Sequence, residues 1–89
     1  MEPLYTFAQA IEMVMRGAKM CRRGWNGIKT GNLEMFVQAQ RPDEHSKMTH
    51  PYLYMTARGT TDGLGWTERT PWQPSQHDMF ANDWLERVE

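Results

Sequence analysis

Hydrophobic residues near the start of the chain are spaced as on one face of an α-helix. They recur with the i, i+3, i+4, i+7 pattern at Phe7, Ala10, Ile11 and Val14. Thr6 and Gln9 have the spacing of a capping box, so the helix is expected to begin directly after Thr6. Gly17 is expected to end it, because glycine adopts the left-handed conformation of a helix C-terminus without strain.

The rest of the chain shows the period-two alternation of β-strands. Alternation predicts strands over residues 18–23, 33–39, 51–56 and 84–88, the third of which opens with a proline, where a strand tolerates it. One face of the second strand is expected to carry Leu33, Met35, Val37 and Ala39. Between the strands we expect a turn at Asn26-Gly27, a polar loop over residues 41–50, and a turn-rich stretch over residues 59–65 followed by a short strand at residues 66–68.

Ser75 and Asp78 form a second capping-box pattern, and Pro74 interrupts the segment before them. A short helix is therefore expected from Ser75 through Phe80. The predicted fold is α+β, with an N-terminal helix packed on a small antiparallel sheet and a short helix before the final strand. Residues 1–89 are expected to form a single domain without repeats or linkers.

Composition limits the classes of partner. The 89 residues carry a net charge of −1, so the chain lacks the basic balance of a protein that binds long DNA or RNA. No apolar stretch is long enough for a membrane span, and the lone Cys21 cannot form an internal disulfide, which fits a reducing cytoplasm. Eight methionines and four tryptophans exceed what so small a core needs, which hints at subunit contacts or a ligand.

Residues 72–84 combine Trp72 and Trp84 with a dense run of short polar side chains. An indole can stack on a flat ring, and hydroxyl and carboxylate groups can orient a polar ligand, so the segment indicates a small-molecule site. The same residues also fit a plain structural role, because Ser75 and Asp78 suffice as a helix cap. Trp84 is expected in the core, since an alternating terminal strand usually buries its large residues.

A second candidate lies at residues 22–27, where two arginines precede Gly24, Trp25, Asn26 and Gly27. Arginine contacts phosphate oxygens through two parallel hydrogen bonds, and glycines let a ligand approach the backbone. The alternative is a hairpin turn with a half-buried indole and solvated arginines. Because neighbouring strand residues point to opposite faces, only one of Arg22 and Arg23 is expected to meet a phosphate.

Known catalytic motifs are absent from the sequence. It contains no phosphate-binding glycine loop, no dinucleotide-binding glycine motif, no nucleophile elbow and no HExxH motif. The three histidines and Cys21 match no metal-ligand spacing. Adjacent helical residues such as His77 and Asp78 point about 100° apart, which argues against an acid–base pair. We therefore expect that the protein is not an enzyme and that it binds no cofactor and no metal ion.

Five segments of the chain resemble, in their order, the motifs of a known family. They are residues 6–10 (TFAQA), Gly17, residues 23–27 (RGWNG), residues 51–55 (PYLYM) and residues 72–84 (WQPSQHDMFANDW). Together they resemble the Thoeris anti-defence family of the second type, small proteins carried by bacteriophages and prophages. The connection over residues 57–70, which adds Trp66, is longer than in the family pattern.

The resemblance implies a molecular sponge in the cytoplasm of the bacterial host. Such a protein is a homotetramer that binds a cyclic ADP-ribose isomer made by the Thoeris immune system and holds it without cleaving it. Some relatives also bind cyclic dinucleotides of the CBASS system at a separate site. A compact dianion requires only local positive charge, so a net charge near zero does not oppose this function.

Under this interpretation each candidate residue has an expected role. Trp25 and Trp72 are expected to stack on the ligand or to wall the pocket. Polar contacts with ribose or base are expected from Asn26, Ser75 and Asp78, a contact with the pyrophosphate from Arg22 or Arg23, and a lining role for Met55 and Thr56. The alternative from another class is a phage inhibitor that acts by protein–protein contact with a host factor.

Overall fold

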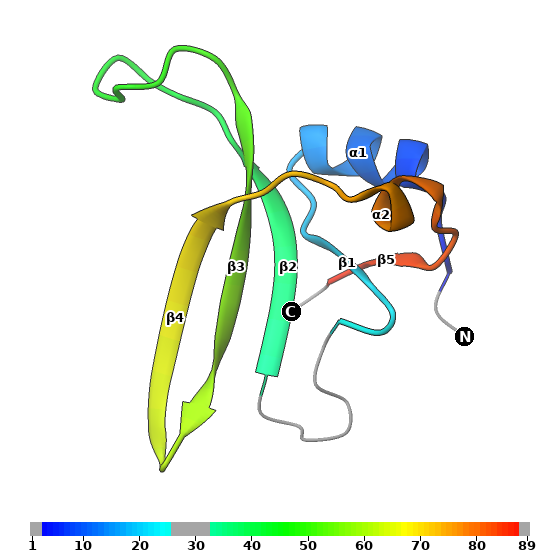
Figure 1. Ribbon diagram of the computed structural model, residues 1–89. Coiled ribbons are helices and arrows are strands. Elements are labelled where there is room, and N and C mark those ends of the chain that lie inside the picture. Colours follow the sequence, from blue (N-terminus) through cyan, green and yellow to red (C-terminus); the bar gives the residue numbers. More distant parts are fainter. Residues whose placement is uncertain (1–2, 26–32, 88–89) are drawn as a thin grey trace.

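The computed structural model describes residues 3–25 and 33–87. This part of the chain forms two helices and five strands, in the order α1 (Phe7–Met15), β1 (Met20–Arg22), β2 (Leu33–Gln40), β3 (Tyr52–Thr61), β4 (Leu64–Pro71), α2 (Gln76–Phe80) and β5 (Trp84–Glu86) (Figure 1). The strands form one antiparallel sheet in the order β4-β3-β2-β1-β5. The predicted α+β fold is thereby confirmed, including the short helix before the final strand.

Both helices begin at the predicted capping boxes. The Thr6 hydroxyl accepts a hydrogen bond from the Gln9 backbone N–H at 3.2 Å, and the Gln9 side chain accepts one from the Thr6 N–H at 2.9 Å. Ser75 and Asp78 make the equivalent bonds at 3.1 and 2.9 Å. Gly17, with φ of +105°, follows the end of α1 in the left-handed conformation expected of it.

Between residues 57 and 71 the sequence prediction is correct about a strand over residues 66–68, but wrong about the lengths of the turn and of the strands. Instead of a turn-rich stretch over residues 59–65 and a short strand at 66–68, β3 continues to Thr61 and β4 begins at Leu64. Only Asp62 and Gly63 form the turn, with φ of +52° and +79°, as in a type I′ hairpin that matches the twist of its strands. The glycines at 59 and 65, which favour a turn in sequence, lie within the paired strands.

The other predicted strands differ only in their bounds. β1 is shorter than the predicted residues 18–23, and β3 is longer than the predicted residues 51–56. β5 ends at Glu86, and the last predicted strand residue, Val88, lies outside the described residues. So does the predicted Asn26-Gly27 turn. The loop over residues 41–50 is observed.

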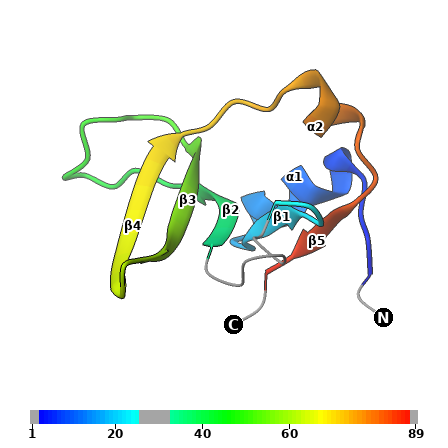
Figure 2. The same cartoon turned by 60° about the horizontal axis from the view of Figure 1, so that its bottom comes forward.

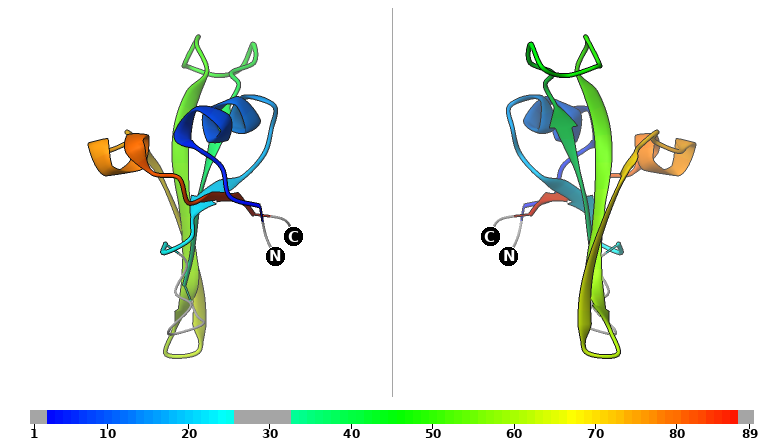
Figure 3. Two further views of the ribbon diagram at one scale, coloured as in Figure 1. Left: turned by 90° about the vertical axis from the view of Figure 1, so that its right-hand side faces the viewer. Right: turned by 90° about the vertical axis from the view of Figure 1, so that its left-hand side faces the viewer.

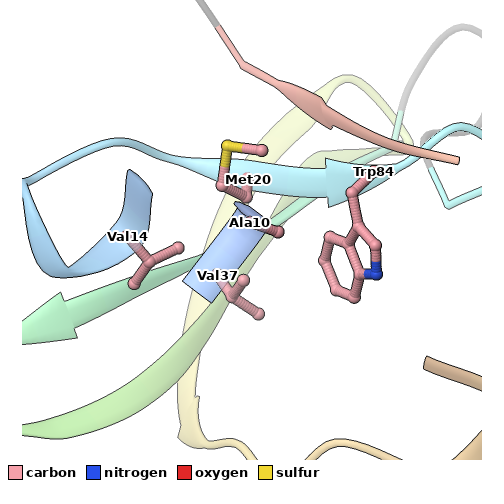
Figure 4. Packing of buried hydrophobic residues seen from close by; sticks show 5 residues of the cluster. All are labelled: Ala10, Val14, Met20, Val37 and Trp84. Atoms are coloured by element: carbon pink, nitrogen blue, oxygen red, sulfur yellow. The ribbon is translucent and has the colours of Figure 1, made fainter. Parts of the chain in front are cut away.

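The core lies where α1 packs on the sheet. Its buried cluster consists of Ala10, Val14, Met20, Val37 and Trp84 (Figure 4). Val37 and Ala39 contribute to this core as the predicted apolar face of β2 requires. The predicted burial of Trp84 is confirmed, since only 1% of the residue is exposed. The β3–β4 hairpin extends away from this compact end of the molecule (Figures 2 and 3).

The opposite face of the sheet is also partly buried, which the alternation of β2 did not predict. Phe36 alternates with Val37 and yet is only 2% exposed. Arg58 and Lys19 lie over its ring, with cation-to-centroid distances of 5.4 and 5.3 Å. Glu34 pairs with Arg58 at 3.0 Å and with Arg87 at 2.7 Å. Charged side chains with long aliphatic stems therefore help to cover this apolar ring.

Candidate functional site

Three tryptophans from distant parts of the chain meet beside the core. Trp25 follows β1, Trp72 follows β4 and Trp84 opens β5. The ring centroid of Trp84 lies 5.2 Å from that of Trp25 and 6.0 Å from that of Trp72, and the latter two lie 6.1 Å apart. All three contacts are edge-to-face, an arrangement that aromatic rings favour. Trp25 and Trp72 are half-buried and are held by the buried Trp84.

Arg22 is tied down by two carboxylates beside this cluster. Its Nη1 donates to Asp78 Oδ1 at 3.1 Å and its Nε donates to Asp83 Oδ1 at 3.0 Å. Asp83 is the main cause of a raised pKa for the Arg22 guanidinium, and Asp78 adds to it. The charge of Arg22 is therefore compensated within the chain. Arg23, by contrast, is exposed, and its backbone N–H donates to the Asp83 carbonyl oxygen at 3.0 Å.

Asp78 links the helix cap to this ion pair. One carboxylate oxygen accepts the Ser75 backbone N–H at 2.9 Å and the other accepts from Arg22. Burial acts to raise the pKa of Asp78, but hydrogen bonds from Ser75 and Arg22 together outweigh it and hold that pKa below its ordinary value. The Asp78 backbone carbonyl also accepts the indole N–H of Trp84 at 3.0 Å. Asp78 thus joins α2, β1 and the tryptophan cluster.

The structure brings together most of the predicted site residues, but not all. Contacts connect Arg22, Trp25, Trp72, Ser75 and Asp78 through Trp84. Met55 packs, half-buried, against the same core. Thr56 lies on the other face, because it pairs with Phe36 in the sheet. Its buried hydroxyl has no hydrogen-bond partner among the described residues. Asn26 lies outside the described residues.

Comparison with known proteins gives the family. Residues 5–86 match the model of the Tad2-like family, the Thoeris anti-defense 2-like domain. The chain belongs to this family. The match spans every described helix and strand and all three clustered tryptophans of this Tad2-like protein, and it confirms the resemblance inferred from the sequence motifs. No curated protein matches the chain at a significant level.

The β3–β4 hairpin of this Tad2-like protein carries grooves that the sequence did not predict. An open groove of about 460 Å³ has Arg58, Trp66 and Thr67 in its lining. Another, of about 320 Å³, is lined by residues that include Tyr52, Tyr54 and Arg69. The Asp62-Gly63 dipeptide between alternating segments is the sequence signal for this hairpin.

Two further findings concern metal ions and membranes. Within residues 3–25 and 33–87, no group of three histidine, cysteine, aspartate or glutamate residues is placed to hold a metal ion. Neither of the two described helices has the length and apolar character needed to cross a membrane.

Proposed function

We propose that this Tad2-like protein sequesters a cyclic ADP-ribose isomer of the Thoeris system. In this proposal it is a phage or prophage protein that acts in the cytoplasm of the bacterial host. Family membership gives the anti-defence role. The observation that carries the choice of ligand is the pair of half-buried indoles, Trp25 and Trp72, beside a polar network at Ser75 and Asp78.

The chemistry of the ligand matches these groups. A cyclic ADP-ribose isomer has an adenine ring that can stack on an indole, ribose hydroxyls that need polar partners, and a pyrophosphate that needs a cation. The exposed Arg23 is better suited to the pyrophosphate than Arg22, whose charge two carboxylates already compensate. To compete with an immune effector, capture must approach nanomolar affinity, about −12 kcal/mol. Preorganised aromatic side chains lower the entropic cost of reaching it.

We propose that the ligand is held without being cleaved. Asp78 is a buried acidic residue whose backbone carbonyl contacts the tryptophan cluster, and both of its carboxylate oxygens accept hydrogen bonds. Its lowered pKa makes it a poor general acid at neutral pH. This arrangement suits a group that fixes the shape of a binding site.

The proposal includes a homo-oligomer, and from the family resemblance a homotetramer. The buried hydrophobic core of the described residues is small, comprising Ala10, Val14, Met20, Cys21, Phe36, Val37 and Trp84, and association is a common way for so short a chain to gain stability. As in some relatives, a separate site for cyclic dinucleotides of the CBASS system is part of the proposal.

Titration calorimetry with a cyclic ADP-ribose isomer, followed by denaturation and mass spectrometry, tests capture and cleavage separately. We expect tight binding and recovery of the ligand with unchanged mass. Recovery of ADP-ribose after prolonged incubation would show catalysis and overturn the non-cleaving mechanism. Absence of binding at micromolar concentrations would overturn the choice of ligand.

A second candidate is inhibition of a host protein by direct contact. Phe80 is 81% exposed and Met79 is 42% exposed on the short helix α2, and such side chains are common in protein interfaces. Phe80→Ala separates the two functions. It is expected to leave nucleotide capture unchanged if the protein is a sponge, and to abolish protection against Thoeris if the protein inhibits a host factor through α2.

A further inference from the structure

Strand β4 leaves one edge of the sheet open. It is the first strand in the sheet order, so among the described strands only β3 pairs with it, and all eight of its residues are exposed. Its pairing with β3 runs without a bulge from Leu64 to Pro71. The hairpin forms a long wing that extends away from both helices (Figures 1 and 3). Natural proteins protect such an edge with bulges, prolines or charged side chains, above all lysine. Residues 64–70 contain no bulge, proline or lysine, and their charged side chains are Glu68 and Arg69.

The ladder fixes which backbone groups point outward from β4. The Trp72 N–H donates to the Leu53 carbonyl at 3.1 Å, in the same register as the β3–β4 pairing. In an antiparallel pair, alternate residues bond to the same neighbour. Residues 64, 66, 68 and 70 therefore bond to β3, whereas Gly65, Thr67 and Arg69 direct their N–H and C=O groups to the open edge.

We propose that a second copy of the chain pairs with this edge, as an antiparallel β4–β4 contact about a two-fold axis at Thr67. The inference rests on the oligomer proposed above and identifies one of its contacts. In this register the outward backbone groups of Gly65 bond to the partner's Arg69, and those of Thr67 bond to the partner's Thr67. Every outward donor and acceptor of residues 65–69 is then satisfied.

Neighbouring registers are less favourable. A two-fold axis perpendicular to the sheet keeps the two faces aligned, so residues of the same face must lie opposite each other. Moving the axis to residue 68 places Glu68 against its own copy, and like charges opposite each other are destabilising. Moving the axis to residue 66 places Leu64, which is 74% exposed, opposite the carboxylate of the other copy of Glu68. The axis at Thr67 avoids both, and it makes the two copies of Trp66 diagonal neighbours, within reach of each other's rings.

Thr67→Pro tests the contact without removing a hydrogen bond of the hairpin. The Thr67 N–H points outward, so proline there leaves the β3–β4 ladder intact and blocks only the new pairing. Multi-angle light scattering is expected to show a twofold lower mass for this variant. Far-ultraviolet circular dichroism is expected to stay unchanged, which checks that the secondary structure is retained.

A pair of cysteine variants tests the register. Directly opposite Thr67 residues have Cα atoms about 5.5 Å apart in a hydrogen-bonded pair, within the range of a disulfide. Thr70→Cys is the matched control on the same strand, because its two copies lie six positions apart, about 20 Å along the strand. Mild oxidation is expected to cross-link Thr67→Cys and not Thr70→Cys, while the buried Cys21 does not react.

The outcomes separate this contact from the oligomer itself. A wild-type chain that is monomeric at micromolar concentrations would overturn both. An oligomer whose mass Thr67→Pro does not change, or in which Thr67→Cys fails to cross-link, would overturn the β4 contact and leave an oligomer built through another surface.

Discussion

At the scale of single residues, Trp84 connects the core to the candidate site. Its ring contacts Phe7 at 5.9 Å between centroids and also both half-buried indoles, and its N–H is bonded to the backbone of α2. One buried side chain therefore sets the positions of Trp25 and Trp72. Stability and binding are expected to respond differently to the three tryptophans.

Trp84→Ala is expected to lower the free energy of unfolding by about 3–5 kcal/mol, because a large buried side chain is lost and a cavity remains. Trp25→Ala and Trp72→Ala are expected to leave the chain folded and to weaken nucleotide capture by about 1–3 kcal/mol each through lost stacking. Thermal unfolding and titration calorimetry of all three variants check this. If both of the latter variants bind as tightly as the wild type, the assigned pocket is wrong and inhibition of a host protein becomes the better explanation.

The Asp78 carboxylate should make stability depend on pH. Its pKa is lower in the folded chain than the ordinary value of 3.8, so its stabilising contribution is fully present above that value and is lost as the pH falls through the folded pKa. Asp78→Asn is expected to be less stable than the wild type at pH 7. The difference between the two is expected to shrink below about pH 4. Urea unfolding across this range is the measurement, and a difference that is constant with pH would contradict the assignment.

At the scale of elements, the β3–β4 hairpin depends on its two-residue turn. Gly63 has a φ of +79°, and a Cβ added there meets no atom within 4 Å, so alanine would act through backbone strain alone. Gly63→Ala is expected to destabilise the hairpin by about 1–2 kcal/mol. Hydrogen exchange of β3 and β4 amides measures the effect. Gly24→Ala is the matched control, since the space there is equally open and the φ of Gly24 lies outside the left-handed region. Equal losses in both variants would contradict the explanation.

The elements also show what the sequence can predict. Periodicity and capping boxes located both helices because these signals are local, as the Thr6–Gln9 and Ser75–Asp78 bonds confirm. The two strands of the hairpin were predicted too short because Gly59 and Gly65, which lie within them, resemble turn residues. The burial of Phe36 beneath charged side chains was not predicted, because Glu34, Arg58 and Arg87 approach one another only after folding. Sequence likewise singled out Trp25 and Trp72, whereas their shared support by Trp84 is a tertiary contact.

At the scale of the whole molecule, the helix-covered part of the chain and the β3–β4 wing differ in how much surface they bury. The helix-covered part buries the core and assembles the tryptophan cluster, whereas the β3–β4 wing exposes every residue of its outer strand. The family match spans both parts. If a second copy covers the exposed strand β4, as proposed above, the stability of the fold is linked to association.

This linkage predicts that the unfolding temperature depends on protein concentration. Association that requires folded chains stabilises the folded state by mass action. A tenfold rise in concentration contributes about 1.4 kcal/mol for each dimer that forms, or about 0.7 kcal/mol for each chain. This corresponds to a rise of about 3–6 °C in the unfolding temperature of a domain of this size. Differential scanning calorimetry of the wild type over a hundredfold range of concentration is expected to show this rise, and Thr67→Pro is expected to show a weaker one. Identical unfolding temperatures for the wild type throughout that range would mean that folding and association are independent, and would remove the physical reason for pairing at β4.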